Sequence, residues 1–79
     1  MDQYNVYIVT MCKYSGALGK YTLGAFSSLE KACKHAKSEE SFRGIKYTAI
    51  IEEVTIDEEY NSLNSPVLNT YNSDGDFLK

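Results

Sequence analysis

The sequence of 79 residues predicts one α+β domain, in which a single helix packs on one face of a four-stranded antiparallel sheet. A chain this short has room for one hydrophobic core, and a composition of 43% hydrophobic and 24% charged residues is ordinary for a folded protein. Two runs rich in β-branched and aromatic residues precede one segment with helical spacing of its apolar residues, and two more follow it. The predicted order is therefore β-β-α-β-β, and residues 1–79 form a single domain.

The first two strands are predicted over residues 4–12 and 21–26, joined by a glycine-containing loop over residues 13–20. Side chains alternate across a strand, and the first strand is apolar on both faces: Val6 and Ile8 on one, and Tyr7, Val9 and Met11 on the other. This pattern is typical of a central strand that is covered on both sides, or of a strand that keeps one face for a partner.

A helix is predicted from Ser27, as the N-cap of a capping box with Glu30, to about Glu40. Its apolar residues recur at the spacing i, i+3, i+4 and i+7 and form one narrow stripe: Leu29, Ala32, Cys33 and Ala36. The small size of these residues allows the helix axis to approach the sheet closely. Gly44 is placed to end the helix in the left-handed conformation.

The third strand is predicted over residues 46–56 and is followed by a polar turn over residues 57–62. The apolar alternation of this strand slips at Glu52 and Glu53, which indicates a β-bulge at that point.

The fourth strand is predicted over residues 66–71 and begins with a proline, which is typical of an edge strand. A tight turn over residues 72–76 would bring Phe77 and Leu78 back to the core. A right-handed crossover of the helix gives the strand order 2-1-3-4, with the first and third strands in the centre.

The net charge is only −3, but the charges are unevenly distributed. Residues 13–46 hold seven Lys or Arg and three Glu, whereas residues 57–79 hold five acidic residues and one Lys. Tight binding of duplex DNA needs several cations on one surface. This balance therefore makes nucleic acid an unfavoured partner.

No apolar run reaches the length of a membrane-spanning helix, and the first residues lack the basic stretch of a secretory leader. We therefore expect a cytoplasmic protein that does not enter a membrane. In that compartment Cys12 and Cys33 are expected to be reduced.

No group of residues has the pattern of a catalytic, cofactor or metal site. The segment Gly16–Lys20 is too short for a phosphate-binding loop and precedes a strand rather than a helix. The segment Asn72–Asp76 lacks the distal glutamate of a calcium loop, and His35 is the only histidine. A zinc site would need about four ligands at matched spacing. The sequence therefore predicts neither an enzyme nor a bound cofactor or metal.

Seven tyrosines are the unusual feature of the composition, and tyrosine is enriched at protein interfaces. One helix covers only one face of the sheet, so we expect the other face to bind a protein or a second copy of the chain as a homodimer. The favoured interaction residues are Tyr7, Val9, Met11, Tyr21 and Tyr47. The opposite register of the helix would instead expose Tyr4, Val6 and Ile8.

Three segments carry a family resemblance: Tyr7–Thr10, then Gly24–Ala32 with the sequence GAFSSLEKA, and Ile51–Asp57 with the sequence IEEVTID. They resemble small β-β-α-β-β proteins of unknown function that are common in phage and bacterial genomes. The shared motifs are a helix cap and a strand end. The resemblance therefore implies the fold and a phage or bacterial origin, and it implies no catalytic residue.

The expected function is that of a non-enzymatic protein-binding module, encoded by a phage, that occludes a surface of a host enzyme or defence complex. One alternative is a nucleic-acid-associated accessory protein that uses the basic helix face formed by Lys31, Lys34 and Lys37. Binding of nucleic acid that persists at physiological salt would favour it. Another alternative is a small-ligand-binding regulatory domain with a pocket between the sheet and a partner subunit.

Overall fold

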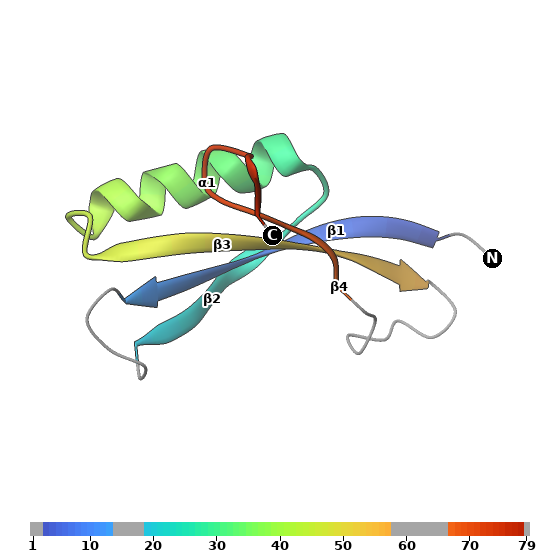
Figure 1. The fold of residues 1–79 in the computed structure, drawn as a ribbon, viewed down its shortest axis with the longest axis horizontal. Coiled ribbons are helices and arrows are strands. Elements are labelled where there is room, and N and C mark those ends of the chain that lie inside the picture. Colours follow the sequence, from blue (N-terminus) through green and yellow to red (C-terminus); the bar gives the residue numbers. More distant parts are fainter. Residues whose placement is uncertain (1–2, 14–18, 58–66, 79) are drawn as a thin grey trace.

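The computed structural model describes residues 3–13, 19–57 and 67–78, which form one helix and one sheet (Figure 1). The elements are β1 (Gln3–Lys13), β2 (Lys20–Phe26), α1 (Leu29–Phe42), β3 (Tyr47–Asp57), β4 (Val67–Tyr71) and β5 (Phe77–Leu78). All neighbouring strands are antiparallel, in the order β2-β1-β3-β4-β5. The α+β class and the order 2-1-3-4 are thus confirmed, and residues 77–78 add a short fifth strand.

Two predicted connections fall largely outside the described residues. Most of the loop over residues 13–20 and of the polar turn over residues 57–62 belongs to the segments that the structure does not describe.

Helix α1 lies across β2, β1 and β3 on one face of the sheet (Figure 1). Ala32 and Ala36 have no exposed surface, and they form the core together with four strand residues: Val9, Met11, Ala49 and Ile51. Leu29 and Cys33 pack half-buried against this core. The predicted apolar stripe of the helix is therefore confirmed, and its alanines bring the helix close to the strands.

The pairing of β1 with β3 determines which side chains share the helix side of the sheet. Tyr7 is opposite Glu53, Val9 is opposite Ile51, and Met11 is opposite Ala49. Because Val9 and Met11 belong to the core, the side chains of all three residue pairs face α1. The residue pairs between them have side chains on the other face of the sheet, away from the helix.

Two β-bulges interrupt the regular pairing. The pairing of β1 with β2 shifts between Val9 and Thr10, and that of β3 with β4 shifts between Glu53 and Val54. The second shift skips Leu68 of β4, whereas β3 pairs with β1 without interruption, so the irregularity beside the two glutamates lies in β4 and the bulge predicted within β3 is wrong.

The helix begins one residue later than predicted. Ser28 has extended backbone angles (φ −145°, ψ 154°), and its Oγ accepts a hydrogen bond of 3.2 Å from the backbone N–H of Lys31. The third residue after this cap is Lys31, so the capping box with Glu30 does not form. The prediction of Ser27 as the N-cap is therefore wrong.

The helix ends in a Schellman motif at Gly44, which has a φ of 65°. The backbone N–H of Ile45 donates to the carbonyl of Glu40, and that of Gly44 donates to the carbonyl of Ser41, both at 3.0 Å. The predicted left-handed cap is confirmed.

The turn between β4 and β5, over residues 72–76, lies beside α1 (Figure 1). The Nζ of Lys37 is 3.0 Å from the Oδ1 of Asp74, and the Oγ of Ser73 donates a hydrogen bond of 2.8 Å to the Oε1 of Glu40. These contacts connect the last strand pair to the helix.

Candidate functional site

The five side chains predicted as an exposed interaction surface all lie on the helix side of the sheet. Val9 and Met11 have no exposed surface, and Tyr7, Tyr21 and Tyr47 pack half-buried against the same core. The favoured assignment is wrong because α1 covers the opposite face from the one expected. The small residues of α1 leave space between the helix and the sheet, and the larger side chains on the Val9 and Met11 face of β1 fill that space.

Tyr21 and Tyr47 form an aromatic cluster at the C-terminal end of α1, with ring centroids 5.6 Å apart. The guanidinium of Arg43 lies 5.2 Å from the Tyr21 ring centroid and 5.5 Å from that of Tyr47. The Nε of Arg43 donates to the Tyr21 hydroxyl at 3.1 Å, and this hydroxyl donates to Glu39. Burial, and then the hydrogen bond to Glu39, raise the pKa of Tyr21, and Arg43 opposes the rise. The cluster ties the end of the helix to β2 and β3.

The face of the sheet opposite α1, called the open face below, is mainly uncharged along β1 and β3. Its half-buried side chains on β1 and β3 are Val6, Ile8, Thr10, Cys12, Thr48 and Ile50. Glu52, opposite Ile8, is the one charged side chain that the described parts of β1 and β3 place on this face. Branched aliphatic residues on a sheet face are suited to packing against a second apolar surface.

Glu53 is a buried carboxylate on the helix side of the sheet, with 8% of its surface exposed. Its Oε2 accepts hydrogen bonds from the Asn5 Nδ2 at 2.7 Å and the Tyr7 hydroxyl at 3.2 Å. Its Oε1 accepts from the Asn69 Nδ2 at 2.8 Å and the Tyr71 hydroxyl at 3.0 Å. The hydrogen bond from Asn69 is the main cause that lowers the pKa of Glu53, while burial opposes it. With two donors on each oxygen, the carboxylate serves to hold three strands together.

The sequence contains a signal for this cluster that the sequence analysis missed. Asn5 and Tyr7 are two residues apart in β1, as Asn69 and Tyr71 are in β4, so each pair lies on one face of its strand. The Asn-x-Tyr pattern thus occurs on both strands that flank the strand of Glu53. It indicates that side-chain donors from both neighbours can hydrogen-bond to this carboxylate.

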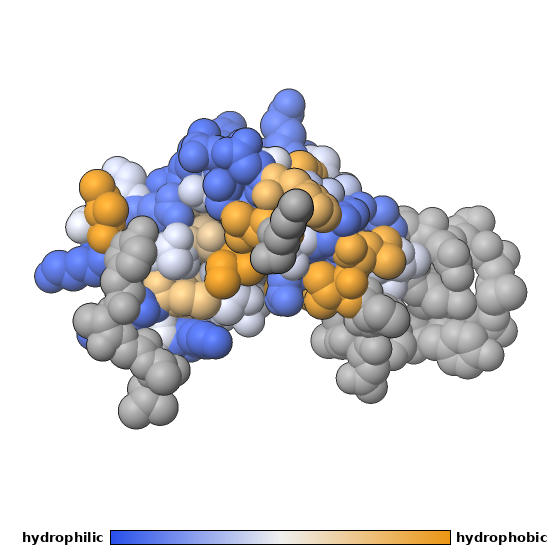
Figure 2. Space-filling view, in the orientation of Figure 1, coloured by the Kyte–Doolittle hydropathy of each residue, from blue (hydrophilic) through white to orange (hydrophobic). Residues whose placement is uncertain are grey.

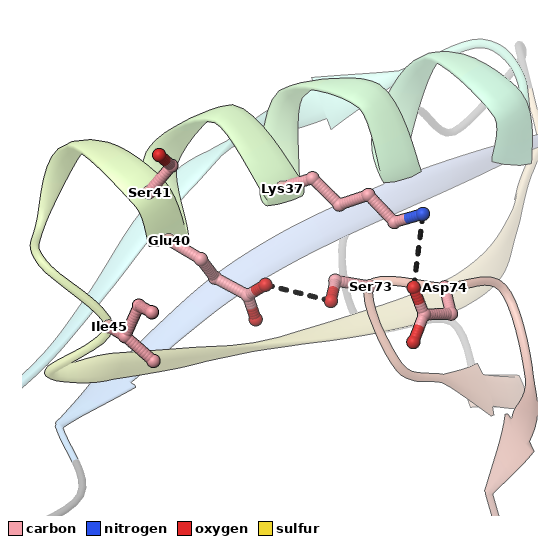
Figure 3. A pocket seen from close by; sticks show the side chains of 6 residues that line it. All are labelled: Lys37, Glu40, Ser41, Ile45, Ser73 and Asp74. Carbon is pink, nitrogen blue, oxygen red and sulfur yellow. Dashed lines mark hydrogen bonds and ion pairs between the residues drawn. The ribbon is translucent and has the colours of Figure 1, made fainter.

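A shallow groove lies between the C-terminal half of α1 and the turn between β4 and β5 (Figure 3). It is lined by Lys37, Glu40, Ser41, Ile45, Ser73 and Asp74. Figure 3 shows that Lys37 is paired with Asp74, and Glu40 with Ser73, across this groove. Lys37 is thus engaged with a carboxylate, whereas the other two lysines of the predicted basic helix face, Lys31 and Lys34, are exposed.

Metal ligands and cysteines give no further site in the described part of the chain. Within residues 3–13, 19–57 and 67–78, no group of three His, Cys, Asp or Glu side chains is placed to hold a metal ion. Cys12 and Cys33 carry free thiols, and burial raises the pKa of the Cys33 thiol. The described helix is too short and too polar to cross a membrane.

Comparison with known proteins identifies one family. The family model for a domain of unknown function, DUF7336, matches residues 4–64. No curated protein and no solved structure matches the chain. Because the family model covers more than half of the sequence, this chain belongs to the DUF7336 family.

Proposed function

We propose that this member of the DUF7336 family is a non-enzymatic module that binds another protein through the open face. The observation that carries the proposal is the mainly uncharged character of that face, where six half-buried side chains without charge lie around Glu52 on β1 and β3. Helix α1 covers the opposite face. A sheet with apolar residues on both faces buries the second face against another element.

The character of this face also suggests the chemistry of its partner. A mainly uncharged sheet face fits an apolar sheet or helix face, and the carboxylate of Glu52, opposite Ile8, favours a partner that brings a cation to that point. In the finer form of the proposal, the module is encoded by a phage and occludes a surface of a host enzyme or defence complex, by analogy with other small phage proteins.

Site-specific photocross-linking in cells that make the protein tests this proposal. A photoreactive residue at Thr10, in the centre of the open face, should cross-link to a partner protein. The substitution Ile8→Arg in the same chain should abolish that cross-link, because it places a charge in the apolar contact. The matched charge change Lys34→Glu, on the exposed side of α1, should leave it intact.

The opposite pattern would overturn the proposal. A cross-link that forms from position 34 rather than position 10, or that persists with Ile8→Arg in a folded chain, would place the interface elsewhere. Retention of nucleic acid on a filter at physiological salt, lost on Lys31→Ser and Lys34→Ser, would favour the nucleic-acid alternative.

A further inference from the structure

The large hydrophobic side chains that are exposed in the described residues gather in two patches. Phe42 and Ile45, with 79% and 73% of their surface exposed, form the turn patch where α1 turns into β3. The edge patch on β4 and β5 comprises Val67 (46%), Leu68 (51%), Phe77 (60%) and Leu78 (37%). Figure 2 shows apolar surface at both places from one side of the molecule.

The turn patch has a backbone that does not suit its apolar residue. Ile45 has a φ of 61°, a left-handed conformation that β-branched residues rarely adopt. A Schellman motif often compensates by packing this residue on an apolar side chain of the last helical turn. Here Glu39 and Glu40 occupy those positions, and Ile45 stays exposed. Neither backbone energy nor packing within one chain favours isoleucine at this position, which points to an intermolecular role.

The two patches carry charges of opposite sign at their margins. Arg43 and Lys46 flank the turn patch, whereas Asp74 and Asp76 precede the β5 part of the edge patch. Lys46 and Asp76 are exposed, and neither forms an ion pair with another residue that the structure describes. Each patch therefore matches the other in both apolar character and charge.

We infer that the chain forms a two-fold symmetric dimer, in which the turn patch of each copy docks on the edge patch of the other. A different partner would have to offer an acidic apolar site and a basic apolar site at the right spacing, whereas a second copy supplies both. Since apolar surface at both places is visible from one side of the molecule (Figure 2), a two-fold axis between the two patches would form both contacts and close the assembly. The groove of Figure 3 lies beside Ile45, between the two patches.

The edge patch lies on the outer strands β4 and β5, whereas the proposed function uses the part of the open face on β1 and β3, so the inference is independent of the proposed function. A dimer built in this way leaves Val6, Ile8 and Thr10 available to a separate protein partner.

Sedimentation equilibrium of the purified chain at micromolar concentration tests the dimer. A turn variant, Phe42→Ser with Ile45→Gly, and an edge variant, Leu68→Ser with Leu78→Ser, should each raise the dimer dissociation constant by roughly 30-fold or more. Mixing the two variants should restore association, because one intact turn patch then meets one intact edge patch. Circular dichroism confirms that each variant is folded.

Charge variants add a second measurement. Lys46→Glu alone should weaken the dimer, and Lys46→Glu combined with Asp76→Lys should restore it, because the signs are exchanged on both patches. Ile8→Arg, on the open face, is the control that should leave dimerisation unchanged. A monomeric wild-type chain at these concentrations would overturn the inference. The inference would also be overturned if both patch variants still formed the dimer. It would be overturned as well if the two variants were folded but failed to associate when mixed.

Discussion

The Nδ2 of Asn69 donates a hydrogen bond of 2.8 Å to the Oε1 of Glu53, and this bond joins the edge strand β4 to the central strand β3. Asn5 donates to the other carboxylate oxygen from β1 at 2.7 Å. Since β3 lies between β1 and β4, one buried charge links three neighbouring strands. Hydrogen bonds to a charged group are stronger than those between neutral groups, so this carboxylate stabilises the sheet margin that packs least against the helix.

Replacement of this carboxylate should weaken the fold. Glu53→Gln replaces one acceptor oxygen by an amide donor that faces two existing donors, and we expect a loss of about 2 kcal/mol in the free energy of unfolding. Glu52→Gln, on the open face, is the matched control and should change it by less than about 0.5 kcal/mol. Urea unfolding of the two variants measures the difference, and equal effects would show that the hydrogen bonds of Glu53 contribute little.

The same residue predicts a dependence of stability on pH. Hydrogen bonding lowers the pKa of Glu53 in the folded chain below its ordinary value of 4.5. Its charged form is therefore stabilised more in the folded than in the unfolded state, and that contribution is complete above the ordinary pKa. It is lost as the pH falls through the lowered pKa.

The gap in stability between wild type and Glu53→Gln should accordingly be largest near neutral pH and shrink as the pH falls below 4.5. Urea titrations across this range measure the gap. A constant gap would mean that protonation of Glu53 is not linked to folding.

The position of the helix cap gives a prediction for two adjacent serines. Ser28→Ala removes the oxygen that accepts from the backbone N–H of Lys31 and should cost about 1 kcal/mol of stability. Ser27→Ala should have a much smaller effect, because Ser27 contacts only the exposed Lys31 Nζ at 3.4 Å. Thermal unfolding of both variants distinguishes them. A larger loss of stability for Ser27→Ala would show that Ser27 is the N-cap.

Close packing of the helix on the sheet makes Ala32 sensitive to substitution. Ala32→Asp buries an unpaired carboxylate in the core and should cost about 3 kcal/mol or more. Lys34→Asp introduces the same side chain on the exposed side of α1 and should have a far smaller effect. Chemical denaturation compares the two, and similar losses would contradict the assigned helix face.

The elements and their order followed from local patterns in the sequence. Alternating apolar residues predicted the strands, and the spacing of Leu29, Ala32 and Ala36 predicted the buried side of the helix. The two adjacent serines before the helix offered two cap positions, and the capping-box pattern favoured the wrong one. That choice depends on the backbone angles of a single residue, which composition does not determine.

The face of the sheet that α1 covers could not be read from local patterns. The first strand presents Val6 and Ile8 on one face and Val9 and Met11 on the other, so the local pattern allows either face to join the core. The long-range pairing of β1 with β3, together with the hydrogen bonds that gather around Glu53, distinguishes the two faces. These contacts join residues far apart in the sequence, and for that reason the interaction surface was assigned to the wrong side.

The turn between α1 and β3 gives a last prediction, in which neighbouring substitutions have opposite effects. Gly44 has a φ of 65°, and a Cβ built there meets no atom within 4 Å, so Gly44→Ala should cost about 1 kcal/mol through backbone strain alone. Ile45→Gly relieves the same kind of strain at a residue that is 73% exposed, and it should raise the free energy of unfolding by about 0.5–1 kcal/mol. Urea unfolding measured well below the dimer dissociation constant isolates this effect in the monomer. A loss of stability on Ile45→Gly would show that isoleucine is kept for the fold of the single chain, and the case for an intermolecular role of the turn patch would lose its energetic basis.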